Sequence, residues 1–152
     1  VLITDAQIRF RMGEVEITSK LIDASFPDYR RLIPEKCTLN IELDKAELIR
    51  MTKVAALFAR DSGGSIVCEA KADDGTFSVA AVASELGENS SAMEAKIEQD
   101  AKVTLNSRYL LDALNSTIEG KVIFSMSGKL DPIKIKNAKS DDYTHIIMPL
   151  DS

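Results

Sequence analysis

Apolar and polar residues alternate with a period of two along most of this chain. In the segment AQIRFRM, the apolar residues Ile8, Phe10 and Met12 alternate with arginines. Such alternation predicts a half-buried β-strand. A turn at Gly13 follows, so this strand and the next segment, GEVEITSKL, are expected to form a hairpin. Similar alternation recurs in four later segments: SIVCEA, TFSVAAV, KVIFSMS and PIKIKN.

Two segments break this alternation and show helical periodicity instead. The first runs from Asp44 to about Asp61, and Asp44 with Glu47 is expected to form a capping box at its start. The second runs from Asn106 to about Thr117, with Asn106 as the N-cap. The pattern therefore predicts a strand-rich chain with two helices.

The two helices belong to a repeated pattern. Each follows a strand that contains Thr-Leu-Asn, at residues 38–40 and again at residues 104–106. Each is followed by about three predicted strands. A unit of one strand, one helix and three strands therefore occurs twice between residues 35 and 152, which indicates an internal duplication.

Two similar phrases mark the predicted domain ends. FPDYRRLIP occupies residues 26–34, and DDYTHIIMP occupies residues 141–149. The interval between them has a plausible length for one domain. We therefore predict that residues 35–152 form a complete domain. Residues 1–34, three strands and a tail, are predicted to be the end of a preceding domain whose beginning lies outside this sequence.

Composition narrows the class of protein. The chain has 152 residues, 45% of them hydrophobic and 28% charged, which are ordinary values for a soluble globular protein. No apolar run approaches the ~20 residues of a membrane span, and no leader opens the chain, so no membrane association is expected. Cys37 and Cys68 lack metal-ligand spacing, which favours a reduced, cytoplasmic setting. The net charge of −5, taken alone, argues against a nucleic-acid partner.

Catalytic chemistry is poorly represented. The segment RDSGGS at residues 60–65 is similar to the sequence around a serine-protease nucleophile, but it lacks the flanking Gly and Pro. His145 is the single histidine that could act as a base, and a triad needs three groups in contact. Residues 61–64 are therefore interpreted as the end of the first helix and the turn that follows it. No phosphate loop, metal cluster or dinucleotide motif is present, so we expect neither catalytic activity nor a metal or cofactor.

Several of these segments together resemble one known family. SKLIDASFPDYRRLIP, AALFARDSGGSIVCEA, ASELGENS, NSRYLLDAL, DPIKIKN and IIMPL are similar, in order and spacing, to the bacterial sliding clamp, the beta subunit of DNA polymerase III. The resemblance covers essentially the whole chain, from the junction of the second and third domains to the end of the third. It implies an α+β DNA-clamp fold, with the sheet outside and two helices of the domain on the inner face.

The resemblance also implies a function. A clamp of this type is a head-to-tail homodimeric ring that encircles duplex DNA, has no catalytic activity and tethers the polymerase. The first domain and most of the second would then lie outside this sequence. A free-standing, clamp-like adaptor that binds peptides and forms no ring is the alternative, and domains encoded upstream would distinguish the two.

A basic stripe on the first helix is the candidate DNA contact. On a helical wheel Arg50, Lys53 and Arg60 fall within about 80°. Such a stripe attracts phosphates without reading bases, as a sliding contact must. A solvated helix face is the alternative, but the resemblance places this helix at the central hole. Arg108 on the second helix is expected to act likewise, although Asp112 weakens the local field.

The resemblance further implies a peptide pocket between the second and third domains. It takes short peptides with a Gln and bulky apolar side chains from the polymerase III catalytic subunit, the clamp loader and repair proteins. Each buried anchor contributes about 1.5 to 3 kcal/mol. The matching residues of this chain are Pro27, Arg31, Leu32, Leu130, Pro132, Ile146, Ile147, Met148, Pro149 and Leu150.

Parts of this pocket depart from the family. Alternation indicates that Ile146 and Ile147 do not both point into the pocket, and a buried final strand is the alternative for this segment. Members of the family often have an aromatic residue at the pocket rim. The corresponding position in this chain falls near Gly63, so that wall of the pocket is expected to be lower. The tail after Pro149 is acidic where a basic residue is common. The peptide preference is therefore expected to differ.

Four residues match the family's subunit contact. Leu57 and Phe58 match positions that pack against the first domain of the partner subunit, and Glu85 and Glu88 match the edge strand beside it. Two adjacent apolar residues cannot share one helix face, so one of Leu57 and Phe58 is expected to be exposed; burial of both in the core is the alternative. Without its partner, the edge strand would stay unpaired.

Overall fold

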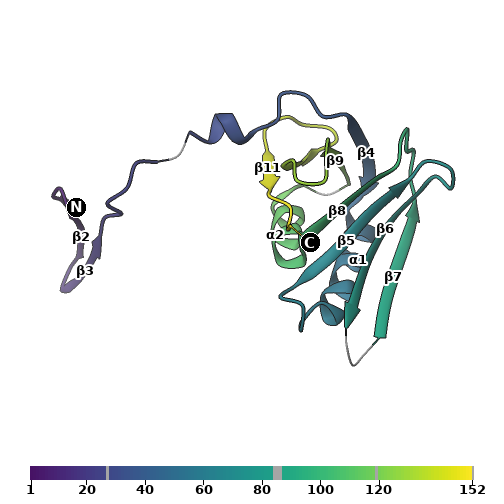
Figure 1. Cartoon of the computed structure of the whole chain (residues 1–152). Helices are drawn as coiled ribbons and strands as arrows, with labels where there is room; N and C mark the ends of the chain where they lie inside the picture. Colours follow the sequence, from purple (N-terminus) through teal and green to yellow (C-terminus); the bar gives the residue numbers. More distant parts are fainter. Residues whose placement is uncertain (27, 84–86, 119, 152) are drawn as a thin grey trace.

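A computed structural model describes residues 1–26, 28–83, 87–118 and 120–151 (Figure 1). The first sheet is antiparallel and contains β1 (Leu2–Ile3), β2 (Gln7–Met12) and β3 (Val15–Lys20) in that order. Met12 pairs with Val15 across a two-residue turn in which Gly13 has a φ of 63°. That left-handed backbone suits glycine and confirms the predicted hairpin.

The three-stranded sheet has little core of its own. Phe10, Met12 and Ile17 are all exposed. Figure 1 shows this sheet well apart from the rest of the chain, joined to it by a segment that includes the 3₁₀ turn η1 (Tyr29–Leu32). A small sheet with bare apolar side chains depends on packing against something else for its stability.

The remaining residues form two units of identical order. The first unit contains β4 (Leu39–Asp44), α1 (Lys45–Phe58), β5 (Ser65–Lys71), β6 (Thr76–Ala83) and β7 (Gly87–Glu94). The second unit contains β8 (Ala101–Asn106), α2 (Ser107–Ser116), β9 (Lys121–Met126), β10 (Ile133–Asn137) and β11 (Thr144–Ile147). The predicted repeat of one strand, one helix and three strands is confirmed.

The two units exchange their first strands. One four-stranded sheet has the order β11-β10-β9-β4, and the other has the order β7-β6-β5-β8. β4 of the first unit therefore completes the sheet of the second unit, and β8 of the second completes the sheet of the first. All neighbouring strands are antiparallel. Because of this exchange, neither unit has a complete sheet without the other.

The helices begin where the sequence predicts, and α1 ends earlier. The side chain of Asp44 accepts a hydrogen bond from the Glu47 backbone N–H at 2.9 Å. The Glu47 carboxylate pairs with Arg50, so the reciprocal half of the expected capping box is replaced by an ion pair along the helix. The helix ends at Phe58, and the Gly64 N–H donates to the Ala59 carbonyl to close the turn. The expected end at about Asp61 was therefore three residues too late.

One hydrophobic core joins the two units. Its centre is an edge-to-face pair of Phe77 from β6 and Phe124 from β9, with ring centroids 5.3 Å apart and an interplanar angle of 61°. Both rings are fully buried. Leu48 of α1 and Leu110 of α2 belong to the same buried cluster. Since the two rings come from different sheets, their contact fastens one sheet to the other.

Replacing Phe124 with alanine is expected to lower the free energy of unfolding by about 3 to 5 kcal/mol, because it leaves a cavity between the two sheets. The measurement is urea unfolding followed by circular dichroism. Ile123→Ala is the control, since this neighbouring side chain is only half-buried and lies on the other face of β9. Equal losses in the two variants would contradict the central role of the aromatic pair.

Candidate functional site

The helices α1 and α2 pack against each other and carry exposed cations on their outer faces. Arg50 and Lys53 are exposed on α1, and Arg108 is exposed on α2. The charge of Arg50 is partly offset by its ion pair with Glu47. Arg60 is exposed but follows the last residue of α1 by two positions, so the helical wheel does not describe its direction. The proposed stripe on the helix itself therefore consists of Arg50 and Lys53.

The adjacent residues Ile146 and Ile147 lie on opposite faces of β11. Ile147 pairs with Ile133 and is 2% exposed, whereas Ile146 pairs with Lys134 and is half-buried. Residues directly opposite in an antiparallel pair share a face of the sheet. Ile147 therefore belongs to the core side of β11, and Ile146 lies on the other face.

A first cavity lies between β11 and α2. It has a volume of about 360 Å³ and is lined by Tyr109 and Asp112 of α2 and by residues 145–148. Met148 is 55% exposed at its edge, and Tyr109 is 56% exposed. The Tyr143 hydroxyl lies 2.8 Å from His145 Nδ1, which fixes the imidazole against β11. An apolar side chain could enter this space against the sulfur of Met148 and the ring of Tyr109.

Sequence reasoning missed Tyr109. The segment NSRYLLDAL is typical of the family, but the sequence analysis singles out only Asn106, Arg108 and Asp112 within it. The available signal was an aromatic residue three positions after a helix cap, on the exposed side of a helix whose apolar residues Leu110 and Leu114 face the core.

A second cavity, of about 200 Å³, lies beside β8. Leu130 and Leu150 line it together with Lys102, Lys129 and Asp151. The Leu150 N–H donates to the Thr104 carbonyl at 2.9 Å, so the segment after β11 runs along the edge of β8. The matched pocket residues thus divide between two cavities, with Ile146, Ile147 and Met148 in the first and Leu130 and Leu150 in the second. Two half-buried prolines, Pro132 and Pro149, line neither.

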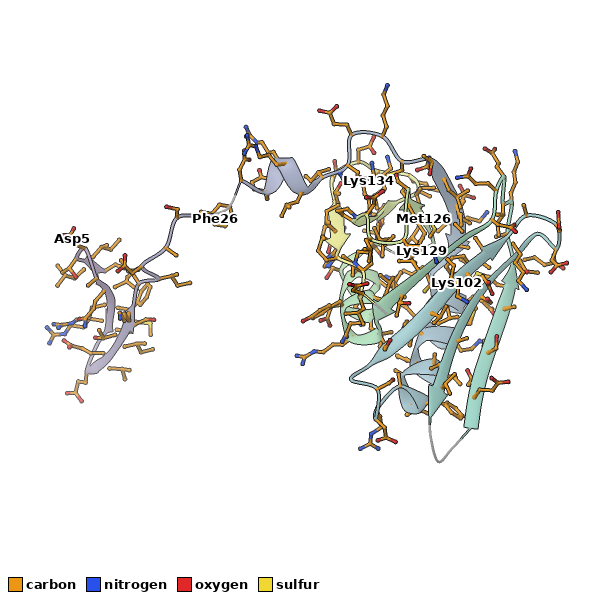
Figure 2. All side chains as sticks on the ribbon, in the orientation of Figure 1. Asp5, Phe26, Lys102, Met126, Lys129 and Lys134 are labelled. Atoms are coloured by element: carbon orange, nitrogen blue, oxygen red, sulfur yellow. The ribbon has the colours of Figure 1, made fainter. Side chains whose placement is uncertain are left out.

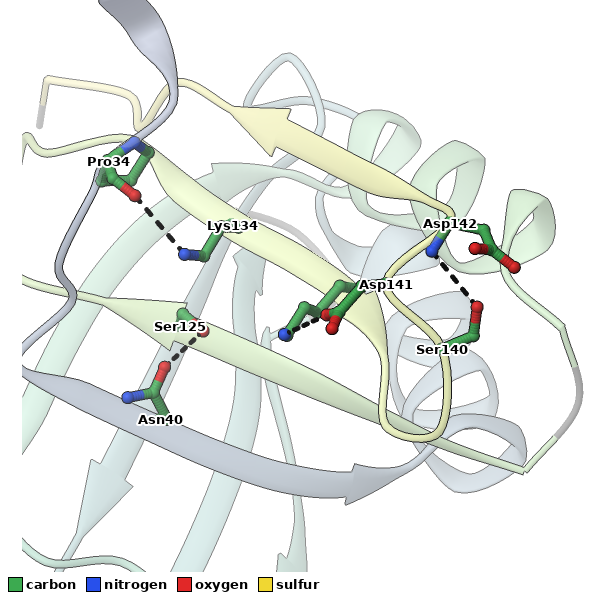
Figure 3. A network of polar contacts seen from close by, with 8 residues as sticks. Pro34, Asn40, Ser125, Lys134, Ser140, Asp141 and Asp142 are labelled. Carbon is green, nitrogen blue, oxygen red and sulfur yellow. Dashed lines mark hydrogen bonds and ion pairs between the residues drawn. The ribbon is translucent and has the colours of Figure 1, made fainter. Parts of the chain in front are cut away.

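The resemblance assigns Pro27, Arg31 and Leu32 to the second-domain side of the peptide pocket. The described residues of this group line neither cavity. Arg31 and Leu32 belong to η1, where both are exposed and Arg31 pairs with Asp28 at 3.7 Å. In the described part of the chain, no residue of η1 lines either cavity. The connecting segment is held by Lys134, whose Nζ donates to the Pro34 carbonyl at 3.4 Å (Figure 3). Pro27 lies outside the described residues.

The predicted subunit contact lies at one edge of the molecule. Leu57 is 62% exposed, whereas Phe58 is half-buried and packs against the core. One of the two is thus exposed, as the helical geometry predicted. Glu88 is exposed on β7, the edge strand of its sheet, and pairs with the exposed Val82. Glu85 lies outside the described residues.

The perturbed ionisable groups lie away from both cavities. Burial raises the pKa of the Cys68 thiol to about 12. A hydrogen bond to Glu42 raises the pKa of Lys121, and a hydrogen bond from Lys136 lowers the pKa of Asp141. Both are surface ion pairs, Lys121 with Glu42 across β9 and β4 and Lys136 of β10 with Asp141 in the following turn, and such pairs contribute little to stability. These shifts have structural causes and do not indicate an acid–base site.

Within the described residues, no group of three or more His, Cys, Asp or Glu side chains could hold a metal ion. Over the same residues, no helix is both long and apolar enough to cross a membrane. The arrangement offers instead two small cavities with apolar walls, a cationic helix face and an edge strand. Surfaces of this kind bind macromolecules and peptides.

Two interlocked units, each of one strand, one helix and three strands, define the chain's class as a duplicated α+β fold. Comparisons with known proteins identify the family. Residues 30–151 match the family model described as the DNA polymerase III beta subunit, C-terminal domain. The Beta sliding clamp of Staphylococcus aureus (strain Mu50 / ATCC 700699) is 27% identical over 146 residues, covering 95% of this chain and 38% of that relative.

Solved structures agree with this match. The DNA polymerase III subunit beta from Pseudomonas aeruginosa has a TM-score of 0.83 and 25% identity, covering 97% of this chain and 40% of that one. A DnaN sliding clamp from the same organism, bound to griselimycin, has a TM-score of 0.80 and 25% identity over the same shares of the two chains. The chain belongs to the bacterial sliding-clamp family, the beta subunit of DNA polymerase III, and corresponds to its C-terminal portion. It spans less than half the length of the relatives it matches.

Asn106 positions the start of α2, and hence Tyr109, through two hydrogen bonds. Its Oδ1 accepts from the Arg108 N–H at 2.9 Å, and its Nδ2 donates to the Gly63 carbonyl at 3.1 Å. Asn106→Ala is expected to lower the free energy of unfolding by about 1 to 2 kcal/mol. Thermal and urea unfolding would measure the loss. Asn115→Ala, at an exposed position near the other end of α2, is the control and should cost much less; a cost as large as that of the cap variant would refute this role.

Proposed function

We propose that this chain is the peptide-docking and DNA-facing C-terminal portion of a replication sliding clamp that acts without catalysis. Family membership together with the interlocked, duplicated fold is the observation that carries the proposal. The protein of which it is part would close into a head-to-tail dimeric ring around duplex DNA in the cytoplasm. In a closed ring, topology keeps the protein on DNA, so affinity for DNA can be low.

The helix face supports the DNA contact. Arg50, Lys53 and Arg108 are exposed on α1 and α2, and Arg60 is exposed just beyond α1. Flexible cations in water attract the phosphate backbone without reading base sequence, and their effect falls with salt. Because Glu47 and Asp112 lie on the same helices, the attraction is weak. Weak, sequence-independent attraction suits a protein that must slide.

The two cavities support peptide docking. Together they provide apolar walls from Leu130, Leu150, Met148 and Tyr109. Beside the second cavity, the backbone at Leu150 already bonds to β8. Bulky side chains of a linear peptide would enter both cavities. The partners would be the polymerase III catalytic subunit, the clamp loader and other proteins with such peptides. Griselimycin bound to a similar clamp supports the view that members of this family take ligands.

The edge at β7 supports the ring. β7 ends its sheet, and exposed Leu57 and Val82 lie on α1 and β6, which pack beside it. An edge strand with apolar neighbours is suited to pair with a strand of another domain. In the ring, the first domain of the partner subunit would take this place, with Leu57, Phe58 and the strand around Glu88 in contact.

Met148→Ala is expected to weaken binding of a labelled peptide that carries a Gln and bulky apolar side chains by about tenfold, since one exposed anchor contact is lost. Fluorescence anisotropy would measure it. Binding to the unaltered chain should itself be weak, because η1 lines neither cavity.

Val82→Ala is the matched control, as it removes an exposed apolar side chain on β6. It should leave peptide affinity unchanged. Equal affinity of the Met148 variant and the unaltered chain would refute the assignment of the first cavity to peptide docking.

A further inference from the structure

A third cavity opens where the two four-stranded sheets come together. It has a volume of about 400 Å³ and is lined by the end of β5, the start of β8 and the end of β9 with its following turn. Lys71, Lys102 and Lys129 contribute to its rim, and we call it the lysine cleft. Figure 2 shows Lys102, Met126 and Lys129 near one another in this region.

Small and apolar residues form the floor of the lysine cleft. Ala70 of β5 pairs with Ala101 of β8, and both line the cleft. Two methyl groups on the same face of a strand pair leave room that larger side chains would fill. Met126 at the end of β9 is 2% exposed and closes the cleft from the other sheet. Ala70 is 1% exposed, so these residues close the bottom of the cleft. Lys71 and Lys102 alternate with Ala70 and Ala101 along their strands and place ammonium groups at the rim from the other face of the sheet.

The acidic residues of the cleft are already engaged. The Glu69 carboxylate lies 4.0 Å from Lys102 Nζ, and Asp100 Oδ1 accepts from the Ala72 N–H at 2.7 Å. Across the described residues, Lys71 and Lys129 have no carboxylate within ion-pair distance. Three lysines and two carboxylates line the cleft, so within a chain of net charge −5 the cleft carries a formal excess of one positive charge beside its apolar floor and can attract an anionic side chain.

The lysine cleft is continuous with the second cavity. Lys102 and Lys129 line both, and Leu130 and Leu150 line the second cavity beyond them. The segment at Leu150 already lies extended along β8, since its N–H bonds to Thr104. Asp151 adds one negative charge to the lining of the second cavity. A peptide that places apolar side chains at Leu130 and Leu150 would therefore continue, at one end, toward the lysines.

We propose that the lysine cleft binds acidic residues that flank the apolar anchors of a docking peptide, so that the partners favoured by this chain carry an acidic–apolar segment. The proposal rests on the peptide docking described above and specifies its partner chemistry. Extended peptide is favoured over nucleic acid because the floor is apolar and continuous with an apolar cavity, whereas the exposed helix cations lie on other elements.

The test compares four labelled peptides on this chain: one with the Gln and apolar anchors alone, one with three acidic residues added before them, one with three added after them, and one with serines added instead. One of the two acidic peptides should bind about fivefold more tightly than the serine peptide at about 0.05 M salt. The gain should vanish at about 0.5 M salt, because exposed charges are then screened.

Lys71→Glu is the variant, since Lys71 lines the lysine cleft and not the second cavity. It should abolish the gain and leave the unextended peptide unaffected. Lys20→Glu, an equal charge change on β3, is the matched control and should keep the gain. A gain for neither acidic peptide, or one that survives in Lys71→Glu, would overturn the inference while peptide docking stands.

Two further outcomes are decisive. If the unextended peptide fails to bind, the proposed docking function fails, and the inference fails with it. If short duplex DNA displaces the acidic peptide and loses affinity to the same extent in Lys71→Glu, the cleft is a phosphate site and the peptide assignment is wrong.

Discussion

Neither half of residues 39–147 can close its own sheet, because the first strand of each half pairs with the other half. β4 pairs with β9, and β8 pairs with β5, so each four-stranded sheet is built from both units. The edge-to-face pair of Phe77 and Phe124 then fastens one sheet to the other. Within one of the sheets, a polar contact also joins the two units, since the buried Ser125 of β9 donates to Asn40 of β4 at 2.7 Å (Figure 3). The interlocked core therefore makes the two units a single rigid body.

This rigidity determines where the functional surfaces lie. The apolar sides of α1 and α2 face the shared core, which leaves their charged sides in water. The strand exchange makes β8 the edge of one sheet, and the other sheet ends at β11; the second and first cavities lie beside these two strands. The proposed ring would need an inner surface that holds DNA weakly and an outer edge that holds peptides. The interlocking of the two units leaves a cationic helix face and edge cavities that could meet these two requirements.

The sequence predicted the elements well and their partners poorly. Period-two alternation and the caps at Asp44 and Asn106 predict strands and helix starts because these are local properties of the backbone. Alternation does not encode which strand pairs with which, so the pairing of β4 with β9 was not foreseen. Arg60 was assigned to the helix because the wheel assumes that the helix continues, whereas the turn at Gly64 ends it.

The candidate sites, too, were only partly predicted from the sequence. Leu130, Leu150 and Met148 were found through family motifs, and each lines a cavity. The lysine cleft was not found, because Lys71, Lys102 and Lys129 lie in three separate segments and meet only where the two sheets meet. Charge counting along the sequence gives a net negative chain and conceals such a site.

The most direct test of the clamp account is to map where duplex DNA touches this chain. Backbone amide shifts of the isotopically labelled chain would be recorded during titration with a short duplex of arbitrary sequence. We expect perturbations at the exposed sides of α1 and α2, around Arg50, Lys53 and Arg108, that are independent of base sequence and disappear at high salt. Perturbations centred on β5, β6 and β7, or a strong preference for one sequence, would contradict the account.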